Sequence, residues 1–145
     1  MYASILVFLQ FTLIALMLFF SNGLSAFTNH TLALAIFLIG LSFALWALNH
    51  NRIGNFHVRP KLKENCKLIT TGIYRFIRHP MYASLILMML SVLISSFSIL
   101  EIILFLLLIV VLVLKALREE SLWECHNEEY KKYKKNSKLF IPYIL

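Results

Sequence analysis

The residues best suited to chemistry lie in one short segment, from Gly72 to Tyr82, directly before a long apolar run. Pro80 suits the first turn of the helix that follows, because this position leaves an N–H unpaired and proline has none. Polar groups at a helix start lie at the positive end of the helix dipole, which favours an anionic group such as a carboxylate or phosphate. The side chains that converge there are Tyr74, Arg75, Arg78, His79 and Tyr82.

A second group of chemical interest is the acidic pair Glu119 and Glu120, which follows the last apolar run. Carboxylates readily accept hydrogen bonds from hydroxyl or amino groups. The pair could simply be a solvated helix start. However, the link Ser95 to Ser98 is so short that the helices on either side of it should form an antiparallel hairpin. The acidic pair would then meet Arg78 and His79 in one pocket at the membrane surface.

The elements that must position these residues are apolar helices. The chain has 145 residues, is 60% hydrophobic and has a mean hydropathy of +0.78, which is too high for an ordinary soluble domain. A transmembrane helix needs about 20 mostly apolar residues, and the alternating segments of a membrane barrel do not occur. We therefore predict an all-α integral membrane protein with four transmembrane helices, the last two an antiparallel hairpin, and a cytoplasmic C-terminal helix within Glu119 to Lys135. The four expected spans are Ala3 to Phe20, Thr31 to Leu48, Pro80 to Phe97 and Ile99 to Leu117.

The positive charges indicate the orientation. Of the 14 lysines and arginines, seven lie between Arg52 and Arg78 and seven between Lys115 and Lys138. The positive-inside rule then places both termini and the second connection in the cytoplasm. The net charge of +7 could suggest nucleic acid. A basic face next to anionic lipid explains it without a nucleic-acid partner.

Other polar residues give weaker indications. The connection from Asn49 to Lys67 is long enough to be functional, but its His57 has no second ligand at metal spacing, so no metal site is expected. Cys66 and Cys125 are expected to be free thiols on the cytoplasmic side. Glu101 is the only acidic residue within a predicted span, and its place near the outer interface should let it reach water.

At these residues the chain resembles the isoprenylcysteine carboxyl methyltransferase family and related integral-membrane phospholipid methyltransferases. The family pattern G-P-Y-x-x-x-R-H-P-x-Y-x-G is matched from Gly72 to Ser84, with Ile73 in place of proline and Ser84 in place of the last glycine. The pattern E-x-x-L-x-x-x-F-G-x-x-Y-x-x-Y is matched from Glu119, with His126 and Asn127 in place of Phe-Gly, and the terminal I-P follows at Ile141. The resemblance covers about Asn51 to the C-terminus.

The resemblance implies an S-adenosylmethionine-dependent methyltransferase with a lipophilic acceptor, either prenylcysteine carboxylate-like or phospholipid amine-like. It implies a multi-pass protein of a bacterial inner membrane, in contact with lipid, with one domain over 1–145. In that domain 1–50 would be scaffold and 51–145 would bind the cofactor. Arg78 and Glu119 are the implied catalytic residues, with Arg78 holding a carboxylate of the cofactor or the acceptor. The implied cofactor-binding residues are Tyr74, Arg78, His79, Pro80, Tyr82, Glu119 and Glu120.

Two other functions fit the sequence. A four-helix transporter subunit, working as a dimer, would need a coupling carboxylate, for which Glu101 is the candidate. A relative of the membrane sterol reductases would bind NADPH instead of S-adenosylmethionine. The oligomeric state and the identity of the acceptor stay open at this stage.

Overall fold

The computed structural model describes residues 2–21, 30–50 and 68–141, and within these ranges the protein is all-helical. It contains five α-helices and a short 3-10 helix, η2, and no strand in the described residues. In chain order the elements are α1 (Tyr2–Phe20), α3 (Thr31–His50), η2 (Gly72–Arg75), α4 (Pro80–Ser96), α5 (Ile99–His126) and α6 (Glu128–Asn136). The predicted connection from Asn49 to Lys67 begins two residues too early, because α3 continues to His50. Its other residues, including His57 and Cys66, lie outside the described residues, as does Pro142.

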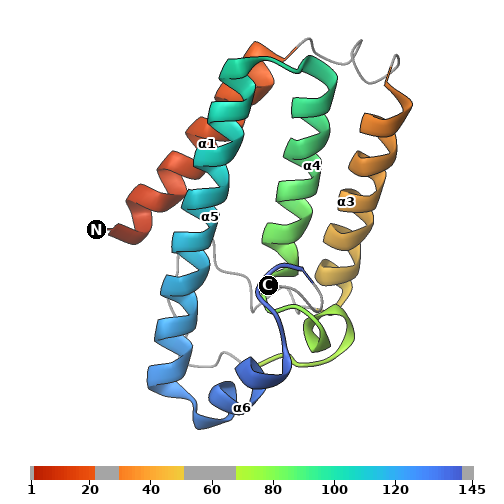
Figure 1. Cartoon of the computed structure of the whole chain (residues 1–145). Coiled ribbons are helices and arrows are strands. Elements are labelled where there is room, and N and C mark those ends of the chain that lie inside the picture. Colours follow the sequence, from red (N-terminus) through yellow and green to blue (C-terminus); the bar gives the residue numbers. More distant parts are fainter. Residues whose placement is uncertain (1, 22–29, 51–67, 142–145) are drawn as a thin grey trace.

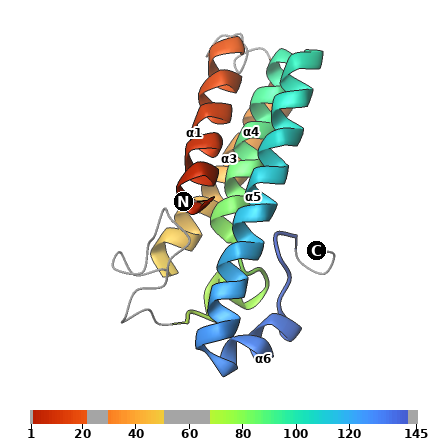
Figure 2. The same cartoon turned by 90° about the vertical axis from the view of Figure 1, so that its left-hand side faces the viewer.

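The four long helices lie side by side in the order α1, α5, α4, α3, and α6 closes one end of the bundle (Figures 1 and 2). α3 packs against α4 through small side chains, which let two helices approach closely where the surroundings are apolar. A Cβ added to Gly40 would lie 3.0 Å from both the Leu87 Cβ and the Ser84 carbonyl oxygen. The buried residues of α3 are Ala33, Gly40, Ala44 and Ala47.

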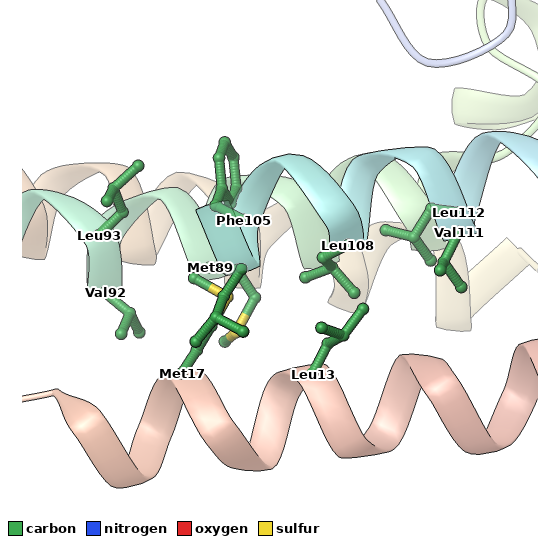
Figure 3. Packing of buried hydrophobic residues seen from close by; sticks show 10 residues of the cluster. Leu13, Met17, Met89, Val92, Leu93, Phe105, Leu108, Val111 and Leu112 are labelled. Atoms are coloured by element: carbon green, nitrogen blue, oxygen red, sulfur yellow. The ribbon is translucent and has the colours of Figure 1, made fainter. Parts of the chain in front are cut away.

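α1 packs against α5 and α4 through an apolar core (Figure 3). Leu13 and Met17 of α1 point toward α5 and α4, where they meet Leu108 and Met89. Leu108 and Met17 are fully buried, which fixes the height of α1 along α5. The core therefore holds α1 beside the pair α4 and α5, although α1 is far from them in the sequence.

Local signals explain where α4 and α5 begin. Pro80 occupies the first turn of α4, as predicted. Phe97 and Ser98 connect α4 to α5, and the Ser98 side chain caps α5 by accepting a hydrogen bond from the Glu101 N–H at 3.2 Å. Serine is a favoured N-cap because its hydroxyl satisfies an unpaired N–H of the first turn.

The prediction of a separate helix within Glu119 to Lys135 was wrong in its boundaries. α5 continues through Glu119 and ends only at His126, because no residue in this stretch interrupts the helix. The break falls at Asn127, whose side-chain oxygen accepts from the Glu129 N–H at 2.8 Å and caps α6. As a result, the acidic pair belongs to the same rigid helix as the apolar run before it.

η2 is joined to the end of α3 by a close contact at Gly72. Gly72 has a φ of +61°, a conformation that L side chains rarely adopt, and a Cβ there would lie 2.2 Å from the His50 Cδ2. Glycine is therefore required for both its backbone conformation and its small size. This contact ties the segment that leads into α4 to the bundle.

Two helices are long and apolar enough to cross a membrane, Thr31–His50 and Ile99–Cys125. The apolar helices Ser4–Phe20 and Pro80–Ser96 are shorter. Large apolar side chains point away from the bundle, such as Phe19, which is 78% exposed, and Ile99, which is 75% exposed. A surface of this kind in water would be an aggregation hazard, whereas lipid accommodates it. The protein is membrane-associated.

Candidate functional site

Segments far apart in the sequence meet at one end of the bundle. They are η2, the start of α4, the polar part of α5, and α6 with the residues that follow it (Figures 1 and 2). The structure thus brings Arg78 and His79 into contact with Glu119 and Glu120.

Glu120 is the buried centre of the charges in this region, since its side chain is only 2% exposed. Its Oε1 accepts a hydrogen bond from the Arg78 Nε at 2.5 Å, and its Oε2 lies 2.9 Å from the Lys134 Nζ. A carboxylate held by two cations can stay ionised inside the protein. Glu120 therefore organises the protein's own residues rather than pointing toward solvent.

Arg78 binds the C-terminal part of the chain. Besides Glu120, its guanidinium donates through Nη1 to the Lys134 carbonyl oxygen at 3.2 Å and to the Ser137 carbonyl oxygen. The planar fork of arginine suits such simultaneous contacts. The sequence suggested that Arg78 holds a carboxylate of the cofactor or acceptor, but the carboxylate that it holds in the structure is Glu120.

The backbone before α4 pairs with the backbone after α6. The Arg78 N–H donates to the Lys138 carbonyl oxygen at 2.7 Å, and the His79 N–H donates to the Leu139 carbonyl oxygen at 3.1 Å. In the other direction, the Lys138 N–H donates to the Phe76 carbonyl oxygen at 2.9 Å. The backbone N–H groups of Arg78 and His79, directly before α4, are therefore engaged by the C-terminal segment.

Three aromatic side chains lie beside the charges. The rings of His79 and Tyr82 stack with centroids 5.4 Å apart, and Phe140 meets both of them edge-on. The Tyr82 hydroxyl donates to the Glu119 Oε1 at 2.5 Å. Tyr82 thus fixes the position of one carboxylate while its ring supports the imidazole.

His79 lies between the two carboxylates. Its Nδ1 is 3.5 Å from the Glu119 Oε2, and its Nε2 is 3.5 Å from the Glu120 Oε1. The Nε2 is buried and makes no hydrogen bond within the described part of the chain. A buried ring nitrogen without a hydrogen-bond partner is a group that a bound ligand could satisfy.

Glu119 is the more accessible of the two carboxylates, with 20% of its side chain exposed. It touches Tyr82 and His79 and is not held by Arg78 or Lys134 through any recorded contact. It can therefore accept hydrogen bonds from a ligand without breaking the ion pairs of Glu120. Two adjacent glutamates of α5 thus have different surroundings.

Tyr74 contributes to this region through its backbone and its packing. Its carbonyl oxygen accepts from the Tyr133 hydroxyl at 2.6 Å, and its side chain packs near Ile73 and Ile77. Burial raises the pKa of Tyr133, so the hydroxyl stays protonated as a donor. Tyr74 therefore helps to dock α6.

Two groups in this region were not identified from the sequence. Lys134 reaches Glu120 and also donates to the Glu124 Oε1 at 2.7 Å, and these hydrogen bonds raise its pKa. Lys115 is buried and donates to Gln10 of α1 at 2.7 Å. The sequence did contain a signal for the pair Lys115 and Gln10, because a polar residue inside an apolar run is functional or paired more often than not.

Glu101 lies far from this region, in the first turn of α5. The expectation that it reaches water was wrong, because it is 0% exposed and faces into the bundle. Neither of the two carboxylate oxygens of Glu101 accepts a hydrogen bond within residues 2–21, 30–50 and 68–141. Cys125 is a free, exposed thiol, as predicted. No group of three potential metal ligands occurs in the described residues.

A family model described as phospholipid methyltransferase matches residues 28–129, which is more than two thirds of the chain. The matched range includes the residues of this region in α4 and α5, namely Arg78, His79, Tyr82, Glu119 and Glu120. It does not include Gln10, and it ends within the first residues of α6. No curated protein matches the chain.

Proposed function

The chain belongs to the phospholipid methyltransferase family of integral-membrane enzymes, and we propose that it transfers a methyl group from S-adenosylmethionine to a lipophilic acceptor. The observation that carries the proposal is the grouping of Glu119, Tyr82 and His79 at the start of α4. It combines a partly exposed carboxylate, an aromatic surface and an unsatisfied buried ring nitrogen.

These residues fit the chemistry of the proposed cofactor. Glu119 can accept hydrogen bonds from ribose hydroxyls or an amino group. The His79 Nε2 lies 3.5 Å from the Glu120 Oε1 without a hydrogen bond between them, so a ligand could bind this nitrogen. Once bound, S-adenosylmethionine would supply a methyl group that the acceptor's nucleophile attacks in line, while the sulfur keeps the electrons of the broken bond. Such a transfer requires alignment and exclusion of water more than acid–base catalysis.

The residues then have distinct proposed roles. Glu119 and His79 bind the cofactor, and Tyr82 orients Glu119 and packs against the ligand. Arg78 and Glu120 act on the site through the position of the C-terminal segment, as their contacts with Ser137 and Lys134 suggest. Pro80 sets the start of α4, and Tyr74 supports the docking of α6.

The proposed acceptor is an amphiphile with its nucleophile at the membrane surface, of the prenylcysteine carboxylate or phospholipid amine type. The cofactor would enter from the cytoplasm and the acceptor from the bilayer. The two proposed entry routes are supported by the position of the site, which lies where the apolar helices meet polar α6. The membrane would be the inner membrane of a bacterium.

We further propose that α1, α3, α4 and the apolar part of α5 all cross the membrane, with both termini in the cytoplasm. A reagent that cannot cross the membrane should then label Ile99→Cys from outside intact cells but not Asn136→Cys, in a background without Cys66 and Cys125. Ile99 is exposed beside the turn between α4 and α5, and Asn136 is exposed at the end of α6.

Permeabilised cells provide the control for this experiment, since both positions should then react. Labelling of Asn136→Cys in intact cells would contradict the proposed orientation. Equal labelling of both positions in intact cells would contradict a membrane-spanning arrangement of α5.

The cofactor assignment is tested by ligand stabilisation. A ligand that binds only the folded protein at 100 times its Kd stabilises it by about 2.7 kcal/mol. We expect S-adenosylhomocysteine to raise the melting temperature of the detergent-solubilised protein and NADPH to leave it unchanged. Stabilisation by NADPH alone would instead favour the reductase, and no effect of S-adenosylhomocysteine at millimolar concentration would contradict the proposed function.

A further inference from the structure

A buried lysine lies on the bilayer side of the proposed site. Lys115 is one helical turn from Glu119 along α5, in the direction of the apolar core. It is 2% exposed, and its ammonium donates to the Gln10 Oε1 of α1 at 2.7 Å. The Nζ also lies 5.0 Å from the centroid of the Tyr82 ring.

This surrounding satisfies the ammonium only in part. A lysine has three N–H donors, and the recorded hydrogen bond uses one of them on a neutral amide. A buried charge is costly unless a charged or strongly hydrogen-bonding partner offsets it. The ring of Tyr82 contributes a cation–π contact, which is weaker than an ion pair. The carboxylate of Glu119 also acts on the ammonium, but the hydrogen bond of Lys115 goes to Gln10. The other N–H donors are therefore suited to a further anionic partner.

We propose that Lys115 binds the oxyanion of the amphiphilic acceptor, a phosphate or a carboxylate, and that Gln10 is a positioning residue that holds its ammonium over Tyr82. The inference rests on the proposed function. Tyr82 connects the two parts of the site, since its ring faces Lys115 and stacks on His79 while its hydroxyl contacts Glu119. An oxyanion at Lys115 would thus lie next to the cofactor-binding residues.

Both proposed acceptor classes carry an oxyanion close to the atom that is methylated. In a phospholipid the phosphate is separated from the amine by two carbons, and in a prenylcysteine the carboxylate is itself the nucleophile. A helical turn spans about 5.4 Å, so the offset between Lys115 and Glu119 is comparable to the separation of phosphate and amine in a phospholipid. A prenylcysteine carboxylate bound at Lys115 would itself have to lie next to the methyl group. Gln10 lies outside the residues 28–129 that the family model matches.

Because Lys115 is buried, the acceptor reaches it through the contact between α1 and α5. Gln10 accepts a hydrogen bond from the ammonium when no acceptor is present. This hydrogen bond weakens when the oxyanion binds. α1, which the sequence suggested was scaffold, then takes part in acceptor binding.

The test uses the purified full chain saturated with S-adenosylhomocysteine and titrated with dihexanoyl phosphatidate, an anionic lipid that is soluble as a monomer. Gln10→Glu places a carboxylate of the same shape beside Lys115, where it competes with the ligand's oxyanion. We expect this variant to stay folded and to bind the lipid at least about tenfold more weakly, because a fixed charge pair is stronger than a neutral hydrogen bond. Lys115→Met should show a similar loss.

The Gln10→Glu variant separates anion binding from a merely structural contact. If Gln10 only joins α1 to α5, the new ion pair should preserve both the melting temperature and lipid binding. Leu13→Val is the matched control, since it loosens the same face of α1 without touching Lys115. Its lipid affinity should stay within about twofold of the wild type, because Leu13 packs in the apolar core and leaves the hydrogen bond between Gln10 and Lys115 in place.

Further ligands identify the source of the oxyanion. Octanoate reports a carboxylate, inorganic phosphate reports a free ion, and hexyltrimethylammonium reports apolar binding alone. Tighter binding of phosphatidate or octanoate than of the other two supports the proposal. Equal binding of hexyltrimethylammonium, or unchanged lipid affinity in Gln10→Glu, overturns it even where S-adenosylhomocysteine binds normally. Failure of S-adenosylhomocysteine to bind the wild type counts against the proposed function instead.

Discussion

Replacing Glu120 by alanine is expected to lower the free energy of unfolding by about 3–5 kcal/mol, the usual effect of removing one partner from a buried ion pair. The side chain is 2% exposed and is the only recorded carboxylate partner of Arg78 in the described residues. Its loss leaves the guanidinium buried without a counter-charge. Thermal and chemical unfolding in detergent, followed by circular dichroism, would measure the change.

Glu124→Ala is the matched control for this prediction. Glu124 also binds Lys134, at 2.7 Å, but its side chain is 35% exposed. Exposed ion pairs contribute at most about 1 kcal/mol, so this substitution should have little effect. Equal losses in Glu120→Ala and Glu124→Ala would show that the burial of Glu120 does not matter to stability.

Replacing the neighbouring carboxylate, Glu119, should weaken ligand binding while the stability of the fold is kept. Glu119→Gln is expected to weaken the binding of S-adenosylhomocysteine by about 1–3 kcal/mol, roughly 5- to 150-fold in Kd, because an amide cannot replace a charged acceptor for the ligand's hydrogen bonds. The fold should be kept, since the Tyr82 hydroxyl can still donate to the amide oxygen. Isothermal titration calorimetry measures the affinity, and a melting curve of the same sample measures stability.

Tyr82→Phe supports the interpretation of Glu119→Gln. It removes the hydroxyl that orients Glu119 at 2.5 Å but keeps the ring that stacks on His79. Its effect on affinity should be smaller than that of Glu119→Gln. An unchanged Kd in Glu119→Gln would remove this residue from the proposed cofactor site.

The sequence was sufficient to predict much of the arrangement around α4. The apolar runs indicated helices near their observed bounds, and Pro80 indicated the start of α4. Hydrophobic periodicity and N-terminal signals are local, so they can be recognised without knowing the fold. The meeting of Arg78 with Glu120 follows from these elements alone.

The contacts of the C-terminal segment could not be predicted in this way. Arg78 binds carbonyl oxygens of Lys134 and Ser137, and the backbone of Lys138 pairs with Phe76. Every residue has a backbone carbonyl, so residue types do not indicate which carbonyl accepts a hydrogen bond. The two segments are also about 60 residues apart in the sequence. The partnership of Gln10 with Lys115 spans even more of the chain and depends on how α1 packs.

The pairing of residues 76–79 with residues 138 and 139 has a consequence for biosynthesis. Chains are made from the N-terminus, so the start of α4 leaves the ribosome well before its partner segment does. During this interval Arg78 has neither Ser137 nor Lys134 to bind. The site is thus the last region to assemble. A nascent chain released before Ser137 would contain the helices that precede it and could keep the ion pair between Arg78 and Glu120. It would lack the backbone partners of Arg78 and His79 at residues 137–139, so the start of α4 would stay without its last contacts.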